Sequence, residues 1–339
     1  MFGRQRALTY SAGGISLFDR QFNGDFMELR QLRYFIAVMD AGSITRACES
    51  LHVVQSAVSH QLRLLEDELG SSLLLRSGFG VSPTPAGTAL YSHARTILKQ
   101  VEDAKSSVAF EASHIAGSVV IGIAGSTAQL CAVPLLAAAR AAYPDVVLSI
   151  HEGVSNALVA ALVAGKIDIA IVYASDATGK LDTLTVVEEP LYFATTDPAA
   201  RRDYAGRTSL ALSELARWPM LMQSVPGATR AAIDRACTKE NIRYTVAAEV
   251  NAPYSLNASV LAGLGSAVLP WVSVTLLQGN DKLLVLPLVN PGVQREVVVV
   301  TRPGSAPSRA TELIRALAFD TLRALHGPLL TGPAPSPPA

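Results

Sequence analysis

The stretch from residue 55 to residue 63 holds side chains that can recognise a nucleic-acid sequence. These are Gln55, Ser56, Ser59, His60 and Arg63. A glutamine amide can pair bidentately with adenine and an arginine guanidinium with guanine, so the five are candidates for contacts to base edges in a DNA major groove. His60 is equally well explained as a solvated surface histidine.

An amphipathic helix is needed to position these side chains. At about 100° per residue, four apolar residues fall on one side of such a helix and the polar residues fall on the other. The apolar residues are Val58, Leu62, Leu65 and Leu69. Ser43 is a good N-cap for a preceding short helix, and residues 29–39 repeat apolar side chains at helical spacing. This pattern is typical of a helix-turn-helix. The alternative is an ordinary bundle whose polar face meets only water.

A small hairpin is predicted after this helix. Gly70 ends the helix, residues 73–76 and 81–83 read as strands, and residues 77–80 read as the turn between them. Such a wing can reach the phosphate backbone, whose contacts position a protein on DNA. The residues that we expect to contact phosphates are Arg33, Ser43, Thr45 and Arg76.

A long helix with an apolar seam is predicted next, because Thr84 is a good N-cap and Pro85 suits a first helical position. The seam repeats at alternating intervals of four and three residues. It consists of Leu90, Ala94, Ile97, Val101, Ala104, Val108, Glu111 and Ile115. A helix over residues 85–115 would be roughly 45 Å long, so we interpret it as a dimerisation helix that loosens at Glu111. The alternative is a single helix packed along a globular surface.

Residues 27–116 resemble the N-terminal region of the LysR-type transcriptional regulators. The resemblance rests on the segments 29–35, 42–47, 55–59, 65–70 and 84–87. It implies a winged helix-turn-helix in residues 27–85, a linker-helix dimer through residues 86–116, and a C-terminal effector-binding domain. It also implies a tetramer that binds promoter DNA and contacts RNA polymerase.

The sequence departs from the family pattern at two positions and is not basic. Ser56 stands where the family usually has proline, and Phe79 stands where many members carry a basic wing residue. Residues 27–85 hold five basic residues against six acidic ones (Arg30, Arg33, Arg46, Arg63 and Arg76; Glu28, Asp40, Glu49, Glu66, Asp67 and Glu68). Affinity must therefore come from how the arginines are placed and from two half-sites, not from net charge.

The remainder of the chain alternates strands with helices. Residues 118–124, 146–151 and 167–173 read as strands separated by helices, and a second round begins near Leu191. This rhythm predicts an open α/β sheet. The resemblance extends over residues 165–170 and 263–270, and it implies a bilobed, periplasmic-binding-protein-like effector domain in residues 117–326. We place lobe I at about 117–188 and 288–326, and lobe II at about 189–287.

A ligand site is predicted where loops follow the carboxyl ends of the strands. Hydroxyls and backbone N–H groups at a helix N-terminus suit a carboxylate, which indicates a small, anionic effector. The candidate residues are Gly125, Ser126, Thr127, Ser155, Gln223, Ser224, Thr229, Asn251 and Tyr254. For each of them, a capping role without any ligand is the alternative.

Other classes of function find little support. The sequence lacks a nucleophile elbow, a phosphate-binding loop and a metalloprotease motif, so we expect neither an enzyme nor a cofactor. Cys48, Cys131 and Cys237 lack metal-ligand spacing and read as buried residues of a reducing compartment, with a redox switch as the minor alternative. No run approaches the ~18 apolar residues of a membrane span, so a cytoplasmic location is expected.

The ends of the chain are expected to be peripheral. Residues 1–26 lack the apolar core of a signal peptide, and Met27 is hypothesised to be the true translation start. Residues 327–339 are rich in proline and are expected to be a disordered tail. A transport solute-binding protein shares the bilobed fold, but the absence of an export signal and the presence of residues 43–69 argue against it. The sequence therefore favours a ligand-responsive regulator of transcription.

Overall fold

The computed structural model describes residues 27–78, 80–109, 115–303 and 307–327. The chain divides into two compact units, one up to Val101 and one from Glu102 onward. The expectations for residues 1–26, Phe79, Glu111 and residues 328–339 lie outside the described residues. Within the described residues, none of the helices is both long and apolar enough to cross a bilayer.

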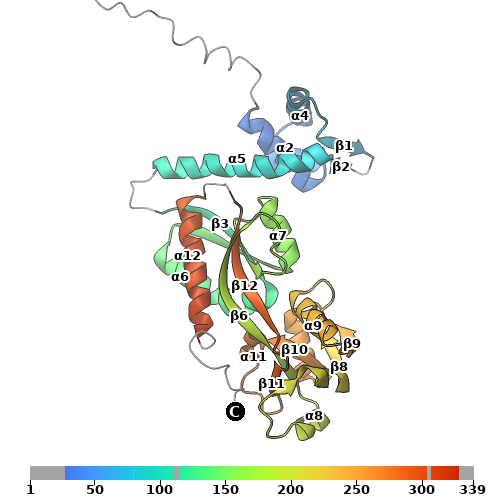
Figure 1. The fold of residues 1–339 in the computed structure, drawn as a ribbon. Helices are drawn as coiled ribbons and strands as arrows, with labels where there is room; N and C mark the ends of the chain where they lie inside the picture. Colours follow the sequence, from blue (N-terminus) through green and yellow to red (C-terminus); the bar gives the residue numbers. More distant parts are fainter. Residues whose placement is uncertain (1–26, 79, 110–114, 304–306, 328–339) are drawn as a thin grey trace, which may run out of the picture. The chain divides into compact units, whose positions relative to one another are not determined.

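The first unit is a winged helix-turn-helix, as predicted (Figure 1). Its elements are α2 (Leu29–Ala41), α3 (Ile44–Leu51), α4 (Gln55–Leu69), β1 (Leu74–Ser77), β2 (Gly80–Pro83) and the first part of α5 (Pro85–Ala109). Ser43 caps α3 by accepting a hydrogen bond from the N–H of Arg46 at 3.5 Å. Gly42 ends α2 in the left-handed region, which glycine enters without a steric penalty.

The core of this unit corrects the predicted apolar face of α4 at one position. Val58, Leu62 and Leu65 are fully buried, but Leu69 is 41% exposed. The helix ends immediately after Leu69 at Gly70, and Glu66 Oε1 accepts hydrogen bonds from the N–H groups of Leu73 and Leu74 at 2.7 and 3.2 Å. This anchoring brings Leu73 into the core cluster, where it takes the place expected for Leu69.

The first half of the predicted heptad seam packs into the core of the first unit. Ala94 is buried in the core of the first unit, and Leu90 and Ile97 pack against that core. Asp40 on α2 fixes the helix, because it accepts a hydrogen bond from Tyr91 and lies 3.5 Å from Arg95 Nη1. The alternative prediction, a single helix packed along a globular surface, therefore holds for the N-terminal part of α5. Ala104, farther along the predicted seam, is exposed.

We predict that Gly87→Ala destabilises this unit by about 2–3 kcal/mol, the cost of an overpacked core. A Cβ at Gly87 would lie 2.0 Å from the carbonyl oxygen of Leu73, so the start of α5 or the chain entering β1 must move. The expected result is a lower thermal midpoint by circular dichroism. Gly78→Ala is the matched control, because its added Cβ meets nothing within 4 Å. Equal midpoints for the two variants would contradict this close packing.

The second unit is an α/β fold around one ten-stranded sheet. Its first lobe contains β3 (Gly117–Ala124), β4 (Val146–Gly153), β5 (Ile169–Tyr173) and β12 (Gln294–Thr301), with helices α6 (Gly125–Ala142), α7 (Ser155–Val163) and α12 (Arg309–Leu325). The strands β4, β3 and β5 are parallel neighbours. The helix α12 runs beside α6 (Figure 1), and the two contribute to one apolar core with residues of β3 and β5.

The second lobe is built around the other end of the same sheet. Its strands are β7 (Leu210–Ala211), β8 (Pro219–Met222), β9 (Thr245–Glu249), β10 (Ser266–Pro270) and β11 (Leu284–Val289). Its helices are α8 (Pro198–Asp203), a 3-10 helix (Leu212–Arg217), α9 (Ala228–Lys239), α10 (Pro253–Leu261) and α11 (Trp271–Leu276). The strands β9, β8 and β10 are parallel neighbours, and β10 pairs antiparallel with β6.

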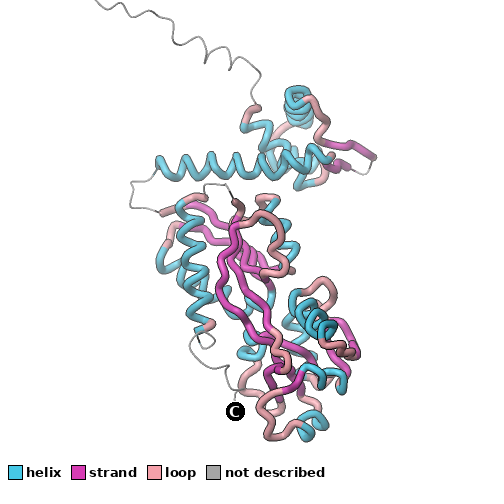
Figure 2. The backbone as a smooth tube through the Cα atoms, in the orientation of Figure 1, coloured by secondary structure: helices cyan, strands magenta, loops and turns pink. Residues whose placement is uncertain are grey.

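One strand, β6 (Asp182–Thr195), belongs to both lobes. Its first nine residues, 182–190, pair with β12, whereas residues 191–195 pair with β10 and β11. Figure 2 shows β6 and β12 as two long strands that run together through the unit. The sequence predicted a lobe boundary at about residues 188–189. In the structure β6 continues through this point as one strand, and its partners change from β12 to β10 and β11 between residues 190 and 191.

Candidate functional site

The helix α4 presents the predicted polar face to solvent. Gln55, Ser56, His60 and Arg63 are exposed and Ser59 is half-buried, while the opposite face is fixed in the core by Val58, Leu62 and Leu65. The Nε atom of Arg63 donates to the carbonyl oxygen of Ser59 at 3.4 Å, one turn back along the helix. The side chain of Arg63 therefore points toward the N-terminal half of α4 and away from Asp67.

The predicted phosphate-contacting residues lie in different surroundings. Thr45 and Arg76 are exposed, and Ser43 uses its hydroxyl as the N-cap of α3. The wing that carries Arg76 is held at its base, because the N–H of Val81 donates to the carbonyl oxygen of Gly42 at 3.0 Å. Arg33 lies apart, in a groove of about 580 Å³ whose lining also includes Leu51 and Leu98.

Three of the six acidic residues in residues 27–85 make contacts away from the exposed polar face of α4. Glu28 pairs with Arg30 at 3.1 Å, Asp40 is held by Tyr91 and Arg95, and Glu66 accepts two backbone N–H groups at the start of β1. The other three, Glu49, Asp67 and Glu68, are exposed, and Asp67 and Glu68 lie in the C-terminal half of α4.

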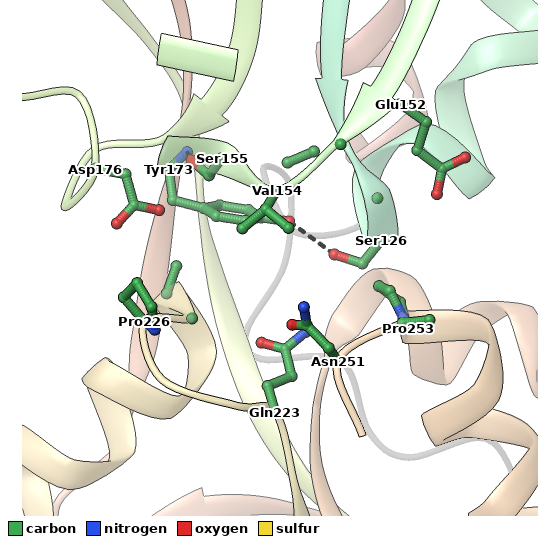
Figure 3. A pocket seen from close by; sticks show the side chains of 16 residues that line it. Ser126, Glu152, Val154, Ser155, Tyr173, Asp176, Gln223, Pro226, Asn251 and Pro253 are labelled. Atoms are coloured by element: carbon green, nitrogen blue, oxygen red, sulfur yellow. Dashed lines mark hydrogen bonds between the residues drawn. The ribbon is translucent and has the colours of Figure 1, made fainter. Parts of the chain in front are cut away.

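A pocket of about 430 Å³ lies between the two lobes of the second unit. Figure 3 shows Ser126, Val154 and Tyr173 of lobe I facing Gln223 and Asn251 of lobe II. Four helices begin at its wall, and each contributes residues at or beside its N-cap. These segments are Ala124–Ser126 of α6, Gly153–Ser155 of α7, Pro226–Ala228 of α9 and Asn251–Pro253 of α10.

Five of the nine predicted ligand-binding residues line this pocket. They are Gly125, Ser126, Ser155, Gln223 and Asn251. The other four do not line it. Thr127 is buried with its hydroxyl 3.3 Å from Tyr173 Oη, Thr229 is buried and accepts from Arg295, Ser224 is only a neighbour of the wall, and Tyr254 is 75% exposed. Tyr254 lies one residue beyond Pro253, and in a helix one residue is a rotation of about 100°.

Sequence reasoning missed several lining residues, among them Glu152, Tyr173 and Asp176. Tyr173 is the last residue of β5 and Asp176 lies three residues beyond it, as the rule for open α/β sheets would suggest. A further signal was available in the N-cap residues. The four helices begin after Ala124, Val154, Gly227 and Ala252, none of which has a side-chain oxygen, and none of these N-termini has a side-chain cap. Four converging helices whose N-cap residues offer no side-chain oxygen leave backbone N–H groups for another partner.

A buried charged cluster lies directly behind the pocket wall. Arg295 on β12 stands opposite Glu189 on β6 in register, and its Nη2 lies 2.7 Å from Glu189 Oε2. Nη1 of Arg295 donates to Thr229 Oγ1 at 3.0 Å, and Nη2 donates to Ser126 Oγ at 2.9 Å. The guanidinium therefore connects the first turn of α6 in lobe I to the first turn of α9 in lobe II.

An aromatic ring and a backbone N–H group complete the contacts of Arg295 and Glu189. The guanidinium carbon of Arg295 lies 4.1 Å from the ring centroid of Tyr173, whose hydroxyl is 2.7 Å from Ser126 Oγ (Figure 3). Glu189 Oε1 accepts the N–H of Val272 at the start of α11, at 2.7 Å. Burial by itself would lower the pKa of Arg295, but the charges and hydrogen bonds of Glu189 and Tyr173 together outweigh burial and raise the pKa, so the guanidinium stays charged.

The cysteines in the second unit are not poised for redox chemistry. Burial raises the pKa of the Cys131 thiol to about 12, and burial together with Asp234 raises that of Cys237 to about 11. The reactive thiolate is therefore scarce near neutral pH. All three cysteines are free and buried. Within the described residues, no cluster of His, Cys, Asp or Glu side chains could hold a metal ion.

Comparison with known proteins identifies both units. Residues 29–88 match the model of the bacterial regulatory helix-turn-helix protein, lysR family, and residues 112–323 match that of the LysR substrate binding domain. The chain is a LysR-type transcriptional regulator. The nitrogen assimilation regulatory protein nac of Escherichia coli strain K12 is 35% identical to it over 245 residues, which cover 72% of this chain and 78% of that protein.

Solved structures share the fold of this regulator over most of its length. A full-length OxyR variant from Pseudomonas aeruginosa superimposes with a TM-score of 0.69 at 23% identity, covering 88% of this chain and 98% of that one. Full-length CbnR, crystallised in complex with its target DNA, gives a TM-score of 0.60 at 24% identity and covers 88% and 99%. The regulator thus combines a DNA-binding domain with an effector-binding domain, and a transport solute-binding protein is not favoured.

Proposed function

We propose that the regulator reads promoter DNA with Gln55, Ser56, Ser59, His60 and Arg63 of α4 and controls transcription through a small effector with an anionic group. Arg33, Ser43, Thr45 and Arg76 contact phosphates in this proposal. The observation that carries the effector part is the pocket between the lobes, where four helix N-termini without side-chain caps converge. Such N-termini favour negative charge.

The proposed response is a population shift between two lobe arrangements. An effector changes the equilibrium only by its differential affinity for the two states, and a pocket lined by both lobes provides contacts that depend on their separation. The regulator acts by binding and not by catalysis. We propose a cytoplasmic dimer through the part of α5 that its own unit leaves exposed, two dimers forming a tetramer, and contact with RNA polymerase at the promoter.

Footprinting of the DNA upstream of the regulator's own gene tests this function. We expect protection of two half-sites at moderate salt and a change in the pattern when the effector is present. Candidate effectors are supplied as a panel of small organic acids and amino acids. An absence of protection would contradict the assignment of α4 as the reading helix.

The same footprint tests the pocket when it is repeated with Val154→Trp. Val154 lines the pocket at the N-cap of α7 and is 43% exposed, so a larger side chain fills the cavity without entering the core. We expect Val154→Trp to protect DNA as the wild type does but to lose the effector-dependent change. Val163→Trp, at the other end of α7 and 54% exposed, is the matched control and should respond normally. A full response from Val154→Trp would contradict the pocket assignment.

A further inference from the structure

The charged side chains of the pocket are both acidic. Of the sixteen residues that line it, only Glu152 and Asp176 carry a charge, and no lysine, arginine or histidine is among them. Figure 3 shows the two carboxylates on either side of the Tyr173–Ser126 hydrogen bond. Neither carboxylate forms an ion pair within the part of the chain that the structure describes.

The centre of the pocket has the opposite polarity. The helices α6, α7, α9 and α10 have 18, 9, 12 and 9 residues, and all four N-termini face the pocket without a side-chain cap. Each N-terminus carries a partial positive charge from the helix dipole. Two arginines contact lining residues from outside the pocket, and both are already paired. Arg295 is buried behind Ser126 and paired with Glu189, and Arg230, which donates to the carbonyl oxygen of Gln223, is paired with Asp234 and Glu249. Recognition of an anion here therefore falls to backbone N–H groups and to neutral donors such as Gln223 and Asn251.

The carboxylate of Glu152 stands close to one of these helix starts. A Cβ built on Gly125, the first residue of α6, would lie 3.1 Å from Glu152 Oε1. An anionic group bound at the N-terminus of α6 would therefore lie beside Glu152. A plain carboxylic acid in that position would meet a like charge that no described residue neutralises, which is unfavourable in a partly desolvated pocket.

We infer that the effector of this regulator is an amino acid, whose carboxylate binds the N-terminus of α6 and whose ammonium group binds Glu152. The inference rests on the proposed role of the pocket. An α-amino acid carries the two charges one carbon apart, and Glu152 Oε1 lies beside Gly125, the first residue of α6. Asp176, on the other side of Tyr173, provides a second acceptor for an N–H donor at the end of the effector's side chain.

Calorimetric titration of the full-length regulator tests this inference. The probes are the common L-amino acids and, for each one that binds, the matching 2-hydroxy acid, which keeps the carboxylate but lacks the ammonium group. We expect at least one amino acid to bind, and its 2-hydroxy acid to bind at least about tenfold more weakly, since a charge-assisted hydrogen bond is lost. Equal or tighter binding of the 2-hydroxy acid, or no binding by any of the amino acids, would overturn the inference.

The substitution Glu152→Gln tests whether the preference for amino acids over 2-hydroxy acids is due to Glu152. The change is nearly isosteric, and Glu152 is exposed, so the fold should be retained. We expect amino-acid affinity to fall about tenfold and 2-hydroxy-acid affinity to stay equal or rise. Glu240→Gln, at the exposed C-cap of α9, loses the same charge outside the pocket and should bind as the wild type does. Equal losses in both variants, or none in Glu152→Gln, would overturn the role of Glu152.

Failure of this inference is distinguishable from failure of the proposed function. If Val154→Trp abolishes the response to an effector that carries no ammonium group, the amino-acid inference is wrong and the pocket function stands. If an amino acid binds Val154→Trp as tightly as the wild type, the pocket assignment fails and the inference fails with it.

Discussion

Replacing Arg295 with methionine will destabilise the effector-binding domain by about 3–5 kcal/mol, the cost of removing one partner from a buried ion pair. Glu189 has no exposed surface in the native fold, so its carboxylate would be left as an uncompensated buried charge. The hydroxyls of Thr229 and Ser126 would lose their donor in the same change. Urea unfolding of the full-length protein, followed by fluorescence of Trp218 and Trp271 in this domain, measures the loss.

A second substitution separates the lost charge balance from the lost volume. In Arg295→Met/Glu189→Gln the buried negative charge is removed, and the amide can still accept the N–H of Val272. We expect the double variant to regain a large part of the lost stability, because removal of both charges avoids the desolvation penalty of an isolated ion. If the double variant is no more stable than Arg295→Met, the pair is not what holds this region together.

Replacing Arg63 with alanine will abolish specific DNA binding while leaving the oligomer intact. Each good bidentate contact to a base contributes about 1–3 kcal/mol of discrimination, and a dimer that reads two half-sites loses it twice. Arg63 is exposed on α4 and makes no contact with the described core, so the fold should not change. Footprinting measures specific protection, and light scattering measures the oligomeric state.

The control for this variant is Arg30→Ala, which removes the same charge from the start of α2. Arg30 pairs with Glu28 on the surface, and exposed pairs contribute little to stability. We expect Arg30→Ala to retain specific protection. If Arg63→Ala also retains it, the assignment of α4's exposed face to the major groove is wrong, whatever the affinity for nonspecific DNA.

The DNA-binding domain was largely predictable from the sequence because its signals are local. The N-cap at Ser43, the αL position at Gly70 and the apolar repeat of α4 each depend on residues a few positions apart. The error at Leu69 has the same origin. Periodicity extends an apolar face to the end of a helix, but the hydrogen bonds from Leu73 and Leu74 to Glu66 decide which leucine enters the core.

The pocket was only partly predictable, because its wall combines local and distant signals. Residues after the carboxyl ends of strands were found, as with Gly125 and Ser155. Arg295 could not be assigned, since its partners Glu189, Thr229 and Ser126 are 106, 66 and 169 positions away in the chain. Nothing in the sequence around Arg295 distinguishes a buried ion pair from an ordinary charge at the edge of a strand.

The strand β6 limits how the effector domain can move. Because its residues 182–190 are hydrogen-bonded within one lobe and its residues 191–195 within the other, the lobes cannot slide past one another without breaking a ladder. Rotation is easier, since a sheet accommodates added twist, and the pairing of β6 with β12 already has an irregularity between Val297 and Val298, where twist increases. Rotation about β6 therefore disrupts fewer backbone hydrogen bonds than sliding does, and we expect the proposed effector response to be a change in the angle between the lobes.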